Sequence, residues 1–162
     1  MAPPRRRPSP SPPGRQRFPP PSPPLSRRRQ HPRGPRKPLV LIADDMQDAR
    51  DIYAAYLEVR GFRAVTARDG EQAVEVATSE RPDVIVMDLT MPKMDGIEAT
   101  RRIKRNPRTR KIPVIMLTGY GQRAIEGGAL EAGAAVFLTK PCPPDELEAA
   151  VRRLLDRPAE PS

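Results

Sequence analysis

From residue 39 onward, short apolar runs alternate with segments of helical periodicity. Continuous apolar runs of three or four residues, rich in Val, Ile and Leu, are typical of strands that are buried on both faces of a sheet. A fifth run is more polar, which indicates a strand at the edge of the sheet. The predicted strands are 39–42, 63–66 (the polar one), 84–87, 114–117 and 136–138.

Between and after these runs, apolar residues recur at helical spacing, as Ala49, Ile52, Tyr53 and Tyr56 do. The second helix is preceded by Asp69, with a glutamine three residues later, a variant of the capping box. The other predicted helices run through 49–57, from about 96 to 104, through 124–131 and through 147–155. Five strand–helix repeats predict an α/β fold, a parallel sheet covered by helices on both faces.

Polar side chains follow four of the five predicted strands. Parallel strands all end at one edge of a sheet, where open α/β folds bind their ligands. Alone, the aspartate after the third strand could simply cap a turn, but the group as a whole predicts a shared cleft. Its members are Asp44, Asp45, Asp88, Thr118 and Lys140.

This set of groups suits phosphoryl chemistry. Clustered carboxylates repel one another unless a cation neutralises them, and oxygen ligands of this kind suit Mg²⁺. Asp88 is a candidate nucleophile that would form an aspartyl-phosphate. Thr118 and Lys140 can donate hydrogen bonds to phosphoryl oxygens.

These residues stand in a specific pattern: the Asp44-Asp45 pair, Asp88 followed by Met91-Pro92 and Asp95-Gly96, Thr118 and Lys140-Pro141, with Arg50 in the first helix. Residues 39–157 therefore resemble the receiver domain of bacterial two-component response regulators, of the stand-alone chemotaxis-regulator type. The resemblance implies a flavodoxin-like (βα)5 fold, a doubly wound parallel sheet with strand order 2-1-3-4-5.

The resemblance also implies a role for each residue. Asp88 would accept a phosphoryl group from a histidine kinase or a phosphotransfer protein. Asp45 would bind Mg²⁺ directly and Asp44 largely through a water, while Asp88 and the backbone carbonyl of Thr90 would complete the protein's share of the ligands. Thr118 and Lys140 would hold the phosphoryl oxygens.

Two further features belong to the same resemblance. Phe137 matches the aromatic residue whose rotamer switches together with Thr118 in the family. The Lys140–Pro141 peptide bond is expected to be cis, which is rare outside X-Pro bonds.

The implied function is that of a single-domain response regulator. It would pass its signal to a protein that docks on the face of the fourth helix, fifth strand and fifth helix, or into a phosphorelay. It would not be an enzyme beyond its own phosphorylation and dephosphorylation. One alternative is a docking module that works without phosphorylation. A haloacid-dehalogenase-type phosphatase is disfavoured because the acid pair comes first and is not Asp-x-Asp.

Composition separates residues 1–37 from the receiver domain, 38–157, and from a short tail at 158–162. The formal net charge of +9 is uneven: residues 1–38 hold eleven of the 29 Lys and Arg and no acid, with fourteen of the 23 prolines. This low-complexity segment predicts disorder. It could bind nucleic acid or an acidic surface, or offer proline motifs to a groove, but we favour a solvated extension.

The remaining observations concern location and a second basic cluster. One cysteine, no apolar run long enough to cross a bilayer and no signal peptide core predict a soluble cytoplasmic protein. Seven Lys and Arg between 101 and 111 are interpreted as a solvated face, so nucleic acid is not expected as a partner. Contact with nucleic acid would show as binding that weakens steeply with salt.

Overall fold

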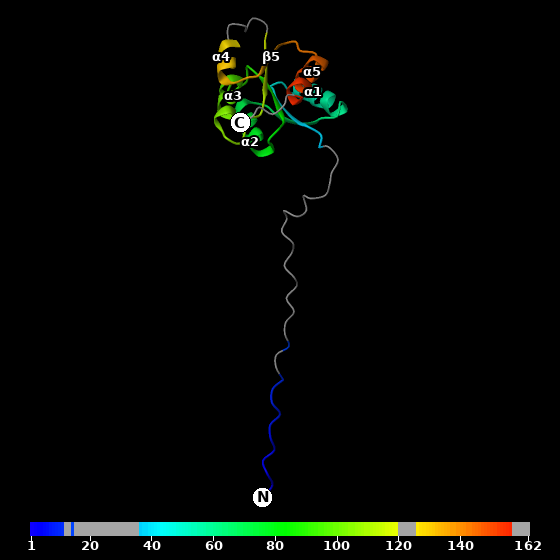
Figure 1. The fold of residues 1–162 in the computed structure, drawn as a ribbon, viewed down its shortest axis with the longest axis vertical. Coiled ribbons are helices and arrows are strands. Elements are labelled where there is room, and N and C mark those ends of the chain that lie inside the picture. Colours follow the sequence, from blue (N-terminus) through cyan, green and yellow to red (C-terminus); the bar gives the residue numbers. More distant parts are fainter. Residues whose placement is uncertain (12–13, 15–35, 120–125, 157–162) are drawn as a thin grey trace. The chain divides into compact units, whose positions relative to one another are not determined.

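The computed structural model describes residues 1–11, 14, 36–119 and 126–156 (Figure 1). Its contacts divide the chain into residues 1–34 and 35–162. In the first unit, residues 1–11 and 14 are exposed and lie in neither helix nor strand. The predicted tail at 158–162 lies outside the described residues.

The second unit alternates strands and helices as the sequence predicts. The strands are β1 (Leu39–Ala43), β2 (Arg63–Ala67), β3 (Val84–Asp88), β4 (Val114–Thr118) and β5 (Val136–Thr139). The helices are α1 (Gln47–Val59), α2 (Gly70–Glu80), α3 (Gly96–Arg105), α4 (Glu126–Ala132) and α5 (Pro144–Leu155). All strand pairs are parallel in the order β2-β1-β3-β4-β5, which confirms the predicted fold and the edge position of the polar strand.

Helices cover both faces of the sheet, with α1 and α5 on one side and α2, α3 and α4 on the other (Figure 1). Successive strand residues point to opposite faces, so each strand contributes to two cores. In β3, Val84 and Val86 pack with α1 and α5, while Ile85 and Met87 pack with the other three helices. Burial on both faces explains why the central strands read as unbroken apolar runs.

A buried glutamate ties α5 to α1. The Glu148 carboxylate accepts hydrogen bonds from Arg60 Nε at 3.0 Å, from Arg152 Nε at 2.9 Å and from the Tyr56 hydroxyl at 3.2 Å. Burial opposes ionisation of this carboxylate, but the hydrogen bonds from Arg152 and Arg60 outweigh it and lower the pKa of Glu148. The Arg152 guanidinium also lies 4.8 Å from the centre of the Phe62 ring, so the cluster joins both helices to the start of β2.

Capping side chains and one close backbone approach fix the loops at the carboxyl edge. Asp69 caps α2 by accepting from the Gln72 backbone N–H, and Asp95 caps α3 by accepting from the Glu98 backbone N–H, each at 2.8 Å. Gly96 is required because a Cβ there would clash with the Asp88 carbonyl oxygen. The start of α3 is thereby held directly against the end of β3.

Two predicted elements differ in detail. The fourth helix was expected over 124–131, and the structure has it at Glu126–Ala132, while Ala124 lies outside the described residues. Residues 136–138 of β5 are only half-buried because the strand lies at the sheet edge. No helix in the described part of the chain is long and apolar enough to cross a membrane.

Candidate functional site

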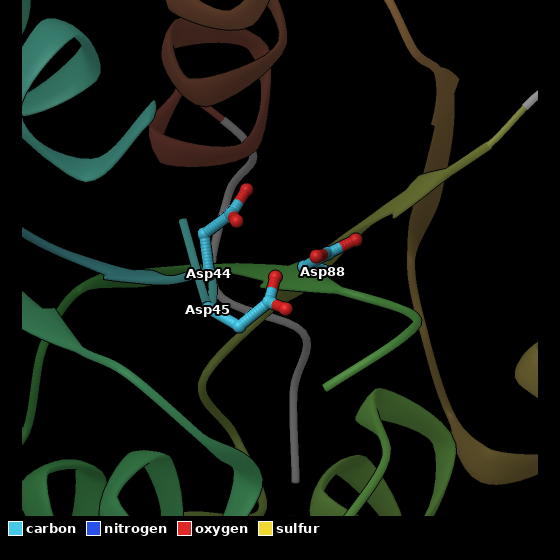
Figure 2. Close-up of side chains that lie close together, drawn as sticks. All are labelled: Asp44, Asp45 and Asp88. Atoms are coloured by element: carbon cyan, nitrogen blue, oxygen red, sulfur yellow. The ribbon is translucent and has the colours of Figure 1, made fainter. Parts of the chain in front are cut away.

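Three carboxylates meet at the carboxyl edge of the sheet. Asp44 and Asp45 follow β1 directly, and Asp88 is the last residue of β3, the neighbouring strand. One ligand oxygen from each lies within 4.8 Å of the others. Figure 2 shows the three side chains gathered at the adjoining ends of the two strands. The sheet thus brings together the aspartates that the sequence predicts.

Lys140 joins this cluster from the loop after β5. Its ammonium lies 2.9 Å from Asp44 Oδ2 and 3.3 Å from Asp88 Oδ1, and its backbone N–H donates to the Thr118 carbonyl at 2.7 Å. Burial disfavours the charged ammonium, but the hydrogen bond to Asp44 and the charge of Asp88 outweigh it, so the pKa of Lys140 is raised. The Lys140–Pro141 peptide bond is cis.

Burial and neighbouring negative charge both disfavour the ionised form of the Asp88 carboxylate. Only 7% of its side chain is exposed. Burial and the neighbouring Asp44 raise its pKa to about 6, against the opposing influence of Lys140. A second cation in the cleft would therefore be favourable, since the buried Asp88 still faces like charge.

The donor set fits Mg²⁺. Three carboxylates from two adjoining strands offer hard oxygen ligands, and the exposed Asp45 leaves one side of the group open to water. Asp44 is buried and already accepts from Lys140 and from the Met46 backbone N–H at 2.9 Å. Thr90, whose carbonyl is the remaining predicted ligand, lies exposed in the segment between β3 and α3.

Thr118 and Phe137 lie on the same face of the sheet. Thr118 ends β4 and is buried, and its hydroxyl donates to the Leu138 carbonyl at 3.5 Å, a long hydrogen bond. Phe137 pairs with Met116, two residues before Thr118, and packs half-buried on the core below α2, α3 and α4. The geometry is compatible with the coupled movement that the resemblance implies, which stays a prediction.

Two residues in α1 hold the site through contacts that the sequence does not predict. Arg50 Nη1 donates to the Asp44 carbonyl at 2.7 Å, which anchors the acid pair. The buried Tyr53 hydroxyl donates to the Cys142 carbonyl at 2.7 Å and so ties α1 to the loop that carries Lys140. Helical spacing alone places Tyr53 on the apolar side of its helix; the hydroxyl on that side is the signal in the sequence that a polar partner is needed.

Comparison with known proteins supports the same interpretation. Residues 40–152 match the model of the response regulator receiver domain. The phosphate regulon transcriptional regulatory protein PhoB of Pseudomonas aeruginosa is 39% identical over 118 residues, which are 73% of this chain and 52% of that protein. The DNA-binding dual master transcriptional regulator RpaA of Synechocystis is 39% identical over 120 residues, 74% of this chain and 50% of that protein.

Solved structures agree. The receiver domain of a sensor histidine kinase from Pseudomonas aeruginosa, which has a magnesium ion in its active-site cleft, matches with a TM-score of 0.70 at 31% identity, over 75% of this chain and 100% of that one. The chemotaxis response regulator CheY4 of Vibrio cholerae matches with a TM-score of 0.70 at 30% identity, over 74% of this chain and 100% of that one.

These matches bear on two expectations. The chain spans about half the length of the curated relatives it matches, so the expectation of a single-domain regulator is not confirmed. One relative is named DNA-binding, so the expectation that nucleic acid is not a partner finds no support either. A sheet of the expected order, a carboxylate cluster at its edge and a family match over most of the folded part lead to one conclusion: the chain belongs to the response regulator receiver domain family.

Proposed function

We propose that Asp88 accepts a phosphoryl group from a histidine kinase or a phosphotransfer protein. A carboxylate oxygen of Asp88 would attack phosphorus as the phosphorus–nitrogen bond of a phosphohistidine breaks, and the donor imidazole would leave with the electron pair. The observation that carries this proposal is the convergence of Asp88, two further aspartates and Lys140 at one sheet edge.

Each neighbour has a task in that transfer, which is mostly positioning and charge neutralisation. The Lys140 ammonium lies 3.3 Å from Asp88 Oδ1, and it can bind an oxygen of the phosphoryl group once that group is on Asp88. Thr118 presents a hydroxyl whose present hydrogen bond is long and easily exchanged. Asp44, Asp45 and Asp88, with the Thr90 carbonyl, would hold Mg²⁺, which neutralises charge that develops on the phosphoryl oxygens when it is bound.

The output is proposed to be a conformational signal, with no chemistry beyond the domain's own phosphorylation and dephosphorylation. A phosphoryl group adds nearly two negative charges and new acceptor oxygens at Asp88. The face of α4, β5 and α5 is the proposed docking surface for a protein target. Two features support it: Leu130 on α4 is a large apolar residue that is 59% exposed, and β5 is an edge strand.

The direct test is labelling with a small phosphoryl donor. The full chain is incubated with Mg²⁺ and acetyl phosphate, and the adduct is followed by intact mass and by its stability in acid and base. We expect one adduct that is stable in acid and labile in base, absent in Asp88→Asn. Asp95→Asn is the matched control, because Asn also caps helices and Asp95 stands at the same edge outside the cluster.

The outcome can go against the proposal in two ways. Equal labelling of wild type and Asp88→Asn would move the phosphoryl group to another residue. Loss of labelling in Asp95→Asn as well would show that the labelling depends on the edge as a whole and not on this carboxylate.

A further inference from the structure

The end of α3 and the loop that leads to β4 form a surface of unpaired positive charge. Residues 101–111 hold seven Lys and Arg and no acid. Arg101 and Arg102 pair with Glu98. The other outward-facing cations are exposed, and none pairs with an acid in the part of the chain that the structure describes. We call them the α3–β4 basic surface: Arg105, Arg108, Arg110 and Lys111.

Hydrogen bonds hold the loop in one conformation. Thr109 is 1% exposed, and its hydroxyl donates to the Ile103 carbonyl at 2.7 Å. The Asn106 carbonyl accepts from the backbone N–H groups of Thr109 and Arg110, and its side chain accepts from that of Arg108. The cations therefore stand on a preformed frame, so a ligand would not have to order the backbone of the loop.

Lys104 is bound inside the loop and does not belong to the α3–β4 basic surface. Its ammonium donates to the carbonyls of Arg110 and Ile112, and burial lowers its pKa. Its side-chain stem lies where a Cβ on Gly133 would come within 2.9 Å. Because Lys104 satisfies the carbonyls inside the loop, the neighbouring cations are left to face solvent.

This surface lies at the opposite edge of the sheet from Asp88. α3 starts at the carboxyl edge and the loop returns the chain to the amino end of β4. The same edge receives Arg36 and Lys37 just before β1, both exposed, and Arg63 at the start of β2. The carboxylate cluster and the basic surface are thus separated by the length of the strands.

The side chains present indicate what kind of ligand fits. No aromatic residue occurs in 101–111, so stacking on the bases of a single strand is not available. The large apolar side chains that are exposed within the described residues lie elsewhere, at Met1, Met46, Ile52, Val59 and Leu130, so the loop lacks the apolar anchors of a membrane-binding segment. Guanidinium groups without acidic partners suit phosphates. We propose that the α3–β4 basic surface binds double-stranded DNA through its phosphates, without reading sequence.

Residues 1–38 are a second source of positive charge, and the experiment has to separate the two. They hold eleven Lys and Arg, no acid and a single aromatic residue, Phe18. Binding of DNA by the full chain alone would not distinguish the two sources of charge. Two variants that lose the same number of charges, one in each segment, distinguish them.

The test measures how the affinity for a labelled duplex of random sequence depends on salt, by fluorescence anisotropy with the full chain. The surface variant carries Arg108→Gln, Arg110→Gln and Lys111→Gln. Each lost phosphate contact lowers the slope of log K against log[salt] by about 0.9, so we expect a slope reduced by about 2 to 3. We expect affinity at about 0.1 M salt to fall at least about 10-fold.

The matched control removes the same charge from the other segment, with Arg5→Gln, Arg6→Gln and Arg7→Gln. We expect the slope of this variant to stay within about 1 of wild type. Labelling of Asp88 by acetyl phosphate, unchanged in the surface variant, shows that its fold is intact. That labelling uses no residue of the basic surface, so loss of one result does not imply loss of the other.

Three outcomes would overturn the proposal. The first is a surface variant with the wild-type slope. The second is a control variant that loses as much of the slope as the surface variant does. The third is binding to vesicles with 30% phosphatidylserine that is about as tight as binding to the duplex, depends on salt as strongly and is weakened as much in the surface variant. That result would assign the surface to anionic membranes instead.

Discussion

Replacing Asp88 with Asn should make the metal-free protein more stable at neutral pH. In the wild type, burial and the charge of Asp44 raise the pKa of Asp88 from 3.8 to about 6, although Lys140 opposes them. The folded state therefore holds the ionised carboxylate at a cost. Asparagine has nearly the same shape and removes the charge that causes this cost.

The direction of the stability change and its pH range follow from the linkage between proton binding and folding. Between about pH 4 and 6 the folded state binds more protons at Asp88 than the unfolded state does, so stability falls as pH rises through this range and is level above it. A shift of about 2 pKa units corresponds to at most about 3 kcal/mol. We therefore expect Asp88→Asn to gain about 1 to 3 kcal/mol at pH 8.

Urea unfolding in EDTA, from pH 4.5 to pH 8, measures this difference for wild type and Asp88→Asn. We expect the gap in free energy of unfolding between wild type and Asp88→Asn to widen with pH and then to level off. Saturating Mg²⁺ should close the gap, because an ion that binds only the folded wild type stabilises it. A gap at pH 8 no larger than the gap at pH 4.5 would refute the reasoning.

Three shorter predictions concern contacts that stabilise the fold. Tyr53→Phe should cost about 1 to 2 kcal/mol in urea unfolding, because it leaves the Cys142 carbonyl buried without its donor, and should slow labelling by acetyl phosphate. Glu148→Gln should be less stable than wild type at pH 7; because the pKa of Glu148 is lowered by folding, this gap should close as pH falls through that pKa. Arg81→Gly should raise the free energy of unfolding by up to about 1 kcal/mol, and with it the melting temperature, because Arg81 ends α2 with a left-handed φ of 48° that glycine adopts more easily.

Much of the fold followed from local patterns. The central strands are buried on both faces, so they read as unbroken apolar runs, and the parallel arrangement places Asp44, Asp88 and Lys140 at one edge without any knowledge of distances. The Asp69 cap with Gln72 also follows from spacing, because both hydrogen bonds are local. Local rules suffice wherever the partners lie within one element or at the ends of neighbouring strands.

Contacts between distant segments did not follow in the same way. Tyr53 and Cys142 are 89 residues apart, and Glu148 meets Arg60 across 88 residues. No periodicity reports which buried hydroxyl meets which carbonyl, since that depends on how two helices pack. The inward turn of Lys104 is a similar case: its spacing fits a solvated face, and only the folded loop shows that it binds carbonyls.

The net charge of the folded part conceals a separation that bears on both proposals. The carboxylate cluster lies at the carboxyl edge and the α3–β4 basic surface at the amino edge, although residues 39–162 hold 18 Lys and Arg against 20 acids. Strands of five residues place the two edges about 16 Å apart, so a phosphoryl group on Asp88 makes no direct contact with the α3–β4 basic surface. Coupling between phosphorylation and DNA binding would have to travel through packed elements, and α3 is the direct route, because Gly96 at its start touches the Asp88 carbonyl and Arg105 at its end belongs to the surface.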